Sequence, residues 1–459
     1  MELRSGRRLR PPQPHGARCQ RRRGPEEVQA DRISALPDEM LLLVLARLGC
    51  VRAAVQTSLL SRRWRGLWTG LTDLAFRRLE PTTIEAVLAR FAHISAVSVY
   101  DVPLPFGNAG HDAAAQANSF LCAAARLSPG KLVFTLPDRH FYVAKIELPC
   151  FPSTASIDLD TKNFPVELMS SGEFAALERL FLSGRINCLC DMLNHCPRLR
   201  VLSVEATSLQ ERLVCVMPPP VHEFTALESL SLTGRIDGLC SLLNCCRHLH
   251  VLSITYMDSR QLTLPSDTEF PVLEKLSLSG NIVGLTTSVN RCPRLRVLRV
   301  TFYGVKIRPI EAALTRLEVA GPFGFQLSLL GFKHISQGHG TNASCFASLL
   351  RIVARLSPQE FLFENCSSQL TIQLFPSFHC TTSIQIKLGL WISFKVLPGS
   401  HFTVLERLSL SGGSIVDLGT MVTLCPRLCE LRVTEARGNI KFHSGSLQKL
   451  SVSTDKWTG

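Results

Sequence analysis

Two cysteines and two histidines lie close together in the stretch CCRHLH, and side chains of these types can bind zinc. They are Cys245, Cys246, His248 and His250. Their spacing does not follow the paired C-x₂-C pattern of zinc-binding domains. Segments of this chain that align with the stretch have arginine in place of His248, as variable surface positions do. The sequence therefore predicts no metal site here.

Motifs of the common catalytic and cofactor-binding sites do not occur in the sequence. We find no phosphate-binding loop, nucleophile elbow, H-E-x-x-H helix or dinucleotide fingerprint. The glycine- and histidine-rich stretch GFKHISQGHGTN at 331–342 follows no clear strand pattern, so we interpret it as a surface loop. The sequence thus predicts no catalytic residue, no cofactor and no metal ligand, and it does not favour an enzyme.

A leucine pattern organises most of the chain. Four segments align with one another, and they begin at Phe174, Phe224, Phe270 and Phe402. Each contains two copies of the element Leu-x-x-Leu-x-(Leu/Ile/Val). This element starts at Leu177, Leu199, Leu227, Leu249, Leu273, Leu295, Leu314, Leu405, Leu428 and Leu447. Most neighbouring starts are 19–28 residues apart, close to the ~20–29-residue period of leucine-rich repeats. The exception is the 91-residue step that follows Leu314.

The pattern predicts one strand and one helical segment in each unit. The last two apolar residues of the element are two apart, so on a strand they point the same way. Between strands, Leu189, Met192, Leu193 and Cys196 have the spacing of one helix face, and Pro197 ends it. A single unit cannot bury this apolar edge alone. We therefore expect an α/β solenoid of stacked parallel strands and helices with a continuous core.

A longer internal repeat indicates an ancestral duplication. AARLSP at 124–129 returns as VARLSP at 353–358, and STASIDLD at 153–160 is echoed by TTSIQIKL at 381–388. Phe174 corresponds to Phe402, and the offsets of the three matches are 227–229 residues. Residues 320–404, which lack the clean leucine pattern, are therefore predicted to be a folded, degenerate stretch of the same solenoid.

The cysteines follow the repeats. The chain has 17 of them, and Cys196, Cys246, Cys292 and Cys425 occupy one equivalent position in four units. A residue that recurs once per unit at a helix end is a packing residue. We therefore predict that these side chains are buried, reduced thiols, as free cysteines usually are.

Positive charge is concentrated at the start of the chain. Of the net charge of +13, the first 80 residues carry +8. Residues 1–30, which include Arg21–Arg23 in a Pro/Gly/Gln-rich segment, are predicted to be a disordered basic arm, with a nuclear-import signal or an anionic contact as alternatives. The sequence shows no secretory signal and no apolar run of the ~20 residues that a membrane span needs. We expect a soluble protein of the nucleus and/or cytoplasm.

The segment that follows the arm predicts a short helical head. A first helix is expected from about Pro37 to Leu48, with Gly49 at its end. Leu41, Val44, Leu45 and Leu48 have the i, i+3, i+4 and i+7 spacing of one apolar helix face. A second helix is expected around Arg52–Thr57. A third is expected in SLLSRRWRGLW, with Ser61 as its cap and with one apolar stripe of Leu60, Trp64, Leu67 and Trp68. Three such helices cannot cover their own apolar surface, so the head should dock on a partner.

The stretch DRISALPDEMLLLVLARLGCVRAAVQTSLLSRRWRGLWTGLTDLAF at 31–76 resembles the F-box of plant F-box proteins. The matching features are Asp31–Ser34, Leu36–Glu39, the leucine helix, Thr57-Ser58, Leu60-Ser61, Arg63-Trp64 and Leu67-Trp68. Plant F-box proteins commonly carry leucine-rich repeats behind this head, with phrases similar to LERLSLSG and CPRLRVL of this chain. Some end in a further C-terminal module, which this chain is expected to lack, so that its last repeat would be poorly covered.

This resemblance implies a non-catalytic substrate receptor of an SCF-type cullin–RING ubiquitin ligase. The head would dock on a Skp-type adaptor, and the repeats would hold an unknown substrate protein. The match to the family motif assigns the adaptor contact to Leu36, Pro37, Met40, Leu41, Val44, Ser61 and Trp64. For each of these, Trp64 especially, the alternative is that the side chain only holds the helices together. For the whole chain the alternatives are a repeat scaffold without ligase coupling, and a nucleic-acid binder that uses the basic arm.

The predicted division of the chain has six parts. They are the arm at 1–30, the F-box at 31–76, a degenerate start of the repeats at 77–173, leucine-rich repeats at 174–320, a degenerate repeat segment at 321–401, and leucine-rich repeats at 402–459.

Overall fold

A computed structural model describes most of the chain. The residues that it describes are 33, 36–77, 79, 81–91, 95–100, 110–136, 144–169, 172–186, 189–205, 223–234, 239–256, 261–265, 268–303, 308–319, 327–335, 343–365, 371–388, 393–396, 400–412, 414–415, 418–435 and 443–453. The predicted basic arm at 1–30 lies outside the described residues. The domain boundaries drawn from the sequence stay predictions.

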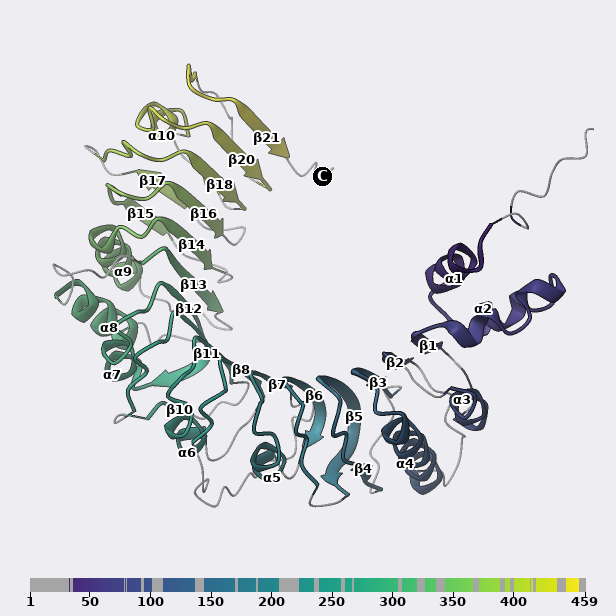
Figure 1. Ribbon diagram of the computed structural model, residues 1–459. Helices are drawn as coiled ribbons and strands as arrows, with labels where there is room; N and C mark the ends of the chain where they lie inside the picture. Colours follow the sequence, from purple (N-terminus) through teal and green to yellow (C-terminus); the bar gives the residue numbers. More distant parts are fainter. Residues whose placement is uncertain are drawn as a thin grey trace, which may run out of the picture.

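Parallel strands stack side by side into an open arc, with the helices along its outer side (Figure 1). The strands are β1 (Asp73–Arg77), β2 (Ala96–Tyr100), β3 (Lys131–Thr135), β4 (Ile146–Leu148), β5 (Ser156–Leu168), β6 (Arg179–Ile186), β7 (Val201–Glu205), β8 (Ser229–Thr233), β9 (Val251–Thr255), β10 (Gln261–Thr263), β11 (Lys275–Val283), β12 (Val297–Tyr303), β13 (Leu329–Ile335), β14 (Glu360–Asn365), β15 (Thr371–Phe375), β16 (Ser383–Leu388), β17 (Ser393–Val396), β18 (Arg407–Ser411), β19 (Ser414–Ile415), β20 (Glu430–Thr434) and β21 (Lys449–Ser453).

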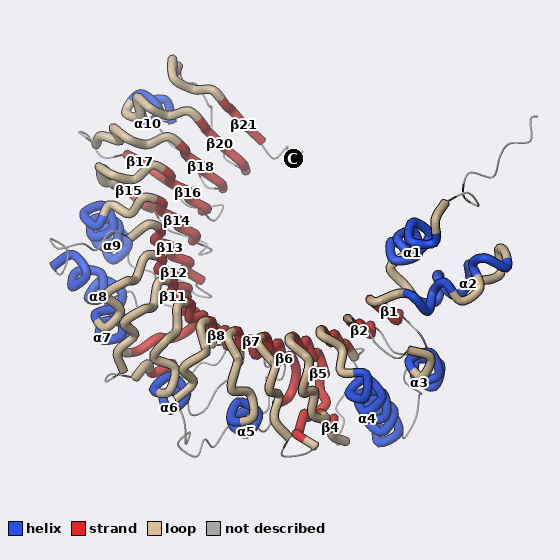
Figure 2. Tube along the Cα trace, in the orientation of Figure 1, coloured by secondary structure: helices blue, strands red, loops and turns tan. Residues whose placement is uncertain are grey.

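Helices form the head at one end of the arc and cover its outer side (Figure 2). The α-helices are α1 (Asp38–Arg47), α2 (Val51–Thr57), α3 (Pro81–Leu88), α4 (Gly110–Leu127), α5 (Leu189–Asn194), α6 (Leu239–Asn244), α7 (Leu285–Asn290), α8 (Arg308–Val319), α9 (Ala343–Leu356) and α10 (Leu418–Thr423). Two 3₁₀ helices, η1 (Arg62–Trp64) and η2 (Leu67–Gly70), complete the head. The predicted α/β solenoid with a helical head is confirmed, apart from the form of the third head helix described below.

The strand register places equivalent apolar residues of successive repeats in one buried row. Leu180 lies opposite Leu202, Leu202 opposite Leu230, and Leu230 opposite Leu252. All four side chains are at most 2% exposed. Each strand therefore covers the apolar edge of its neighbour, and each such leucine contributes ~1.5–3 kcal/mol by leaving water. The alternate side chains of the same strands point to the inner side of the arc, which we call the concave face.

The two halves of the predicted duplication share details of backbone and hydrogen bonding. α4 and α9 are followed by Ser128 and Ser357, whose φ angles are 42° and 40°, left-handed values that few residues other than glycine adopt. Thr154 and Thr381, both fully buried, each donate a 2.6 Å hydrogen bond to the carbonyl oxygen of the proline that follows the serine. β13, β14 and β16, from the stretch that lacks the leucine pattern, continue the main ladder.

Two sequence interpretations are wrong in this region. Leu314 does not begin a strand but lies in α8, where the buried Ile310, Ala313, Leu314 and Leu317 have helical spacing. The stretch at 331–342 is predicted to be a surface loop, yet its residues 331–335 belong to β13, and residues 336–342 lie outside the described residues. The last buried residue of β13 is His334. Because histidine is polar, the sequence pattern there does not indicate a strand. The Nδ1 of His334 is 3.0 Å from Oδ1 of Asn365, which supplies the polar contact that a buried imidazole needs.

The four recurring cysteines are buried and free, as predicted. In three of them the thiol Sγ is 3.0–3.1 Å from the carbonyl oxygen four residues earlier, at the end of the preceding helix. Burial raises the pKa of all four thiols, from 9.0 to about 12. They therefore stay neutral at physiological pH and act as small apolar side chains.

Replacing the two buried threonines tests whether the duplicated halves are energetically equivalent. We expect Thr154→Val and Thr381→Val each to lower the free energy of unfolding by about 1–3 kcal/mol, because a buried carbonyl oxygen loses its donor. The midpoint of urea denaturation measures this, and Thr225→Val at an exposed turn position should change it little. A cost at one threonine and none at the other would contradict the equivalence.

Alkylation tests the state of the cysteines. At pH 8, iodoacetamide should modify the exposed Cys380 readily, whereas Cys196, Cys246, Cys292 and Cys425 should be protected, because a buried thiol with a raised pKa offers little thiolate. Mass spectrometry of the digested protein reports the modified positions. The same reaction in denaturing urea, where all thiols should react, is the control. Equal labelling of all five in the folded chain would refute the packing role.

Candidate functional site

The start of the head is held by one arginine. Asp38 and Glu39 lie in the first turn of α1, where negative charge is favoured by the helix dipole. Nη2 of Arg63 in η1 is 2.8 Å from Oδ1 of Asp38, and it also donates a hydrogen bond to the carbonyl oxygen of Leu36. Arg63 therefore joins η1 to the segment that leads into α1.

One face of the head is part of the solenoid core. Leu41 and Leu45 of α1 are each 1% exposed, and Trp64 and Trp68 are buried in the same core. The ring of Trp68 meets that of Phe91, after α3, edge to face, with 5.8 Å between the ring centroids. The head is therefore packed directly on the first repeat, and its two tryptophans seal the end of the stack.

The predicted third helix is two short 3₁₀ helices instead. Gly66, between η1 and η2, has a φ of 83°, a left-handed conformation that interrupts a helix. The predicted stripe is broken as a result, because Trp64 and Trp68 are buried whereas Leu60 is 71% exposed. Ser61 precedes η1 without a side-chain capping hydrogen bond.

The other face of the head exposes apolar side chains to solvent. Met40, Leu43, Val44 and Leu48 of α1 and its end are 43–58% exposed. Leu59 and Leu60, just after α2, are 87% and 71% exposed. We call these six residues the apolar face of the head. An exposed apolar cluster of this kind is typical of a protein interaction site.

The seven predicted adaptor-binding residues differ in their exposure to solvent. Pro37, Met40, Val44 and Ser61 are exposed, Leu36 is half-buried, and Leu41 and Trp64 are buried. The alternative stated above, a purely structural role, therefore fits Leu41 and Trp64. The structure also divides the apolar stripe of Leu41, Val44, Leu45 and Leu48, because Leu41 and Leu45 are buried whereas Val44 and Leu48 are 45% and 43% exposed.

Four residues of the apolar face are not among the adaptor-binding residues predicted from the sequence, namely Leu43, Leu48, Leu59 and Leu60. Leu43 and Leu48 have helical spacing from Met40 and Val44, and this signal could have found them. Leu59 lies where the chain leaves α2, and no local pattern distinguishes it from a core leucine. The role of the whole set in adaptor binding stays a prediction.

The concave face is the second extended surface. Its central positions form a row that crosses the arc from strand to strand, which we call the middle row. The middle row consists of Val133, Asp158, Phe181, Ser203, Ser231, Ser253, Ser277, Arg299, Gly331, Leu362, Gln385, Ser409, Arg432 and Ser451. Four consecutive serines form its centre. This part of the face is lined by small polar side chains. The part after Ser277 includes the charged residues Arg299 and Arg432 and a cavity beside Gly331.

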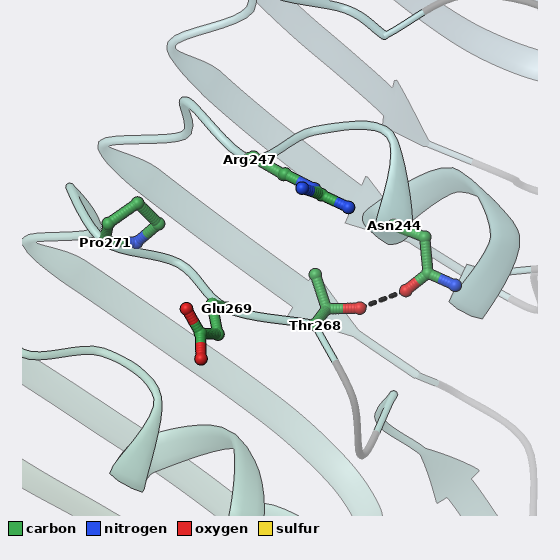
Figure 3. Close-up of a pocket in the computed structure, with 5 residues that line it drawn as sticks. All are labelled: Asn244, Arg247, Thr268, Glu269 and Pro271. Carbon is green, nitrogen blue, oxygen red and sulfur yellow. Dashed lines mark hydrogen bonds between the residues drawn. The ribbon is translucent and has the colours of Figure 1, made fainter.

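A cavity of about 440 Å³ lies between two repeats, beside the segments that lead into β9 and β11 (Figure 3). Asn244 at the end of α6 lines it together with Arg247 and Glu269, and the hydroxyl of Thr268 donates a hydrogen bond to the side-chain oxygen of Asn244. A second cavity, of about 250 Å³, lies at the equivalent junction one repeat earlier, beside Asn194. We therefore interpret both cavities as recurring gaps of the stacking rather than as a ligand site.

Within the described ranges, no group of three or more His, Cys, Asp or Glu side chains could hold a metal ion. Nor does any described helix have the length and apolar character that crossing a bilayer requires.

Comparison with known proteins identifies the head. The F-box domain model matches residues 33–74. The chain is 44% identical over 63 residues to an F-box/LRR-repeat protein of Arabidopsis thaliana, a match that covers 13% of each chain. It is 63% identical over 41 residues to the MEIOTIC F-BOX protein MOF of Oryza sativa subsp. japonica, which covers 9% of this chain and 8% of that protein.

A further relative, an F-box/FBD/LRR-repeat protein of Arabidopsis thaliana, is 49% identical over 51 residues, or 11% of each chain. The aligned parts thus span 8–13% of the length of these three relatives. The resemblance to plant F-box/LRR-repeat proteins is confirmed, and the domain match lies within the predicted 31–76 segment.

Alanine substitutions should separate the two sides of α1. We expect Leu45→Ala and Trp64→Ala to lower the free energy of unfolding by about 2–5 kcal/mol, because each leaves a cavity in the shared core. Met40→Ala and Val44→Ala should change it by at most ~0.5 kcal/mol, because these side chains are already in water. Thermal denaturation of the four variants measures the difference, and a large loss at Met40 or Val44 would show that they support the fold.

Proposed function

We propose that this protein is the substrate-recognition subunit of an SCF-type cullin–RING ubiquitin ligase. In this proposal the apolar face of the head binds a Skp-type adaptor, and the concave face of the solenoid binds the substrate protein. The single observation that carries it is the pair of faces on α1. One face is fixed in the core of the solenoid, and the other leaves four large apolar side chains in water within an F-box domain.

The surroundings of the apolar face indicate what the adaptor should offer. Arg47, Arg52, Arg62 and Arg65 are exposed residues of the same helices and turns. A partner surface with an apolar centre and acidic residues at its rim would complement this arrangement, since interfaces usually combine an apolar core with a polar rim.

The solenoid supports a receptor without catalytic chemistry. Because the head and the repeats share one core, an adaptor bound at α1 would hold the arc in a defined orientation. The substrate's lysines would then be presented to a ubiquitin-conjugating enzyme by position alone. In this proposal the protein acts in the nucleus or the cytoplasm, where such ligases work.

Capture of the adaptor tests the proposal. We expect the double variant Met40→Glu/Val44→Glu to retain less than about a tenth of the wild-type co-purification with a Skp-type adaptor, because two charges would be buried at the contact. Val283→Glu, at a solenoid position that is 38% exposed, is the matched control and should capture the adaptor normally. Circular dichroism establishes that the variants are folded. Undiminished capture by the double variant would contradict the proposed face, and absence of capture by the wild type would favour an uncoupled repeat scaffold.

A further inference from the structure

A hollow opens on the concave face around Gly331 of β13. The cavity there has a volume of about 330 Å³, and Arg299, Lys333, Leu362, Glu364 and Lys387 are among the residues that line it. Gly331 lies between Arg299 and Leu362 in the middle row. We call this cavity the Gly331 hollow.

The hollow exists because position 331 has no side chain. A Cβ atom there would lie 3.3 Å from Cγ of Arg299 and 3.7 Å from Cβ of Leu362. The second distance is an ordinary van der Waals contact and the first is slightly short, so a larger side chain would occupy the space once the flexible Arg299 side chain moved by a few tenths of an ångström. The backbone at Gly331 is ordinary strand, and its glycine is not needed for a left-handed conformation. The floor of the hollow, formed by Gly331 and Leu362, is apolar.

The walls of the hollow carry an excess of positive charge. Nζ of Lys333 and Nζ of Lys387 lie 3.2 and 3.3 Å from the two oxygens of one carboxylate, that of Glu364. Partial burial alone would raise the pKa of Glu364, but the hydrogen bonds and charges of both lysines outweigh it and lower the pKa below its usual value. Glu364 is therefore ionised at neutral pH and balances one of the two lysines.

Arg299 adds a further positive charge, because its guanidinium makes no ion pair or hydrogen bond within the part of the chain that the structure describes. The side chain is exposed on the concave face, in the middle row next to Gly331. The lining of the hollow thus includes three cations and one carboxylate, and an anionic partner could pair with Arg299 and with the lysines.

The charge of the concave face changes along the arc in the same sense. In the middle row and the rows two residues to either side of it, the strands from β3 to β11 carry three bases and three acids, namely Lys131, Arg179, Lys275, Asp158, Asp160 and Glu205. From β12 to β21 they carry six bases and three acids, namely Arg299, Lys333, Lys387, Arg407, Arg432, Lys449, Glu360, Glu364 and Glu430. The hollow therefore lies in the basic half of the face, which favours an acidic partner.

We propose that the Gly331 hollow binds a segment of the substrate protein in which carboxylate side chains flank an apolar one. The apolar side chain enters the space over Gly331 and packs on Leu362. One carboxylate pairs with Arg299, whose guanidinium can bind it through two parallel hydrogen bonds, and another pairs with Lys333 and Lys387. This inference rests on the proposed function, because it takes the concave face as the substrate-binding surface.

Peptide selection tests the chemistry of the bound segment. A library of random 16-residue peptides displayed on phage is selected on the full-length protein, and the enriched peptides are synthesised with a fluorophore. We expect them to contain two or more Asp or Glu residues around an apolar residue. Enrichment of neutral or basic peptides would overturn the proposal, and so would acidic peptides that bind equally well without the apolar residue.

Two pairs of variants locate the binding site by fluorescence anisotropy. Arg299→Glu reverses the charge beside the hollow, and Gly331→Val fills it with a residue that suits a strand. Their matched controls are Arg432→Glu and Ser277→Val, which make similar changes in the middle row outside the hollow. We expect the first pair to weaken binding about tenfold or more and the controls less than about twofold. Equal losses in hollow and control variants would mean bulk charge attraction and would overturn the site.

Adaptor capture by the same four variants keeps the two proposals distinguishable. All four should co-purify with a Skp-type adaptor as the wild type does, because none lies on the head. Loss of peptide binding with adaptor capture intact supports the hollow. If the wild type binds the acidic peptides at the hollow but captures no adaptor, the proposed function fails while the binding site stands.

Discussion

The structure depends on the parallel register that places one repeat's buried side chains against those of the next. The rows through Leu180, Leu202 and Leu230 exist because each strand presents an apolar edge that it cannot bury alone. The buried threonines, the left-handed serines and the recurring cysteines all lie at the places where one unit turns into the next. The free energy of stacking therefore comes from the interfaces between neighbouring repeats, and no repeat has a hydrophobic core of its own.

The same constraint explains the two sides of the head. The first repeat has an apolar edge like any other, and the head, with Trp68 on Phe91, packs there in place of a preceding strand. A ten-residue helix has two sides. With one side used as the end cap, the leucines and the methionine on the other remain in water. The head thus combines a surface that packs in the core with an exposed apolar surface in one element, and the F-box segment of the sequence contains the residues of both.

Much of this architecture follows from periodicity, and the failures have physical causes. The leucine element located the strands wherever apolar residues alternate, and the equivalent cysteine positions indicated packing. Leu314 failed because Leu-x-x-Leu-x-Val also fits a helix face, and only the neighbours Ile310 and Ala313 decide between the two. The strand that contains His334 was interpreted as a loop because histidine is polar. Its burial is explained only by its partner Asn365, which is 31 residues away in the sequence.

The exposure of individual head residues was beyond the sequence for the same reason. Leu41 and Val44 are both apolar and both lie on α1, and which one meets the solenoid depends on where Phe91 and Leu74 lie in space. The Gly331 hollow likewise could not be predicted from the sequence. Arg299, Gly331 and Leu362 are separated by 32 and 31 residues and become neighbours only through strand pairing.

The contact between Trp68 and Phe91 has a consequence for exchanging the head of this chain with that of another F-box protein. Phe91 lies outside the segment that the F-box model covers, so the packing of the head extends beyond the end of the F-box domain. In a chimera joined at residue 76, Trp68 would lie against a residue of another protein. A chimera joined beyond residue 91 would keep Trp68 and Phe91 together. Recombination that exchanges solenoids between family members should therefore leave the first repeat with its own head.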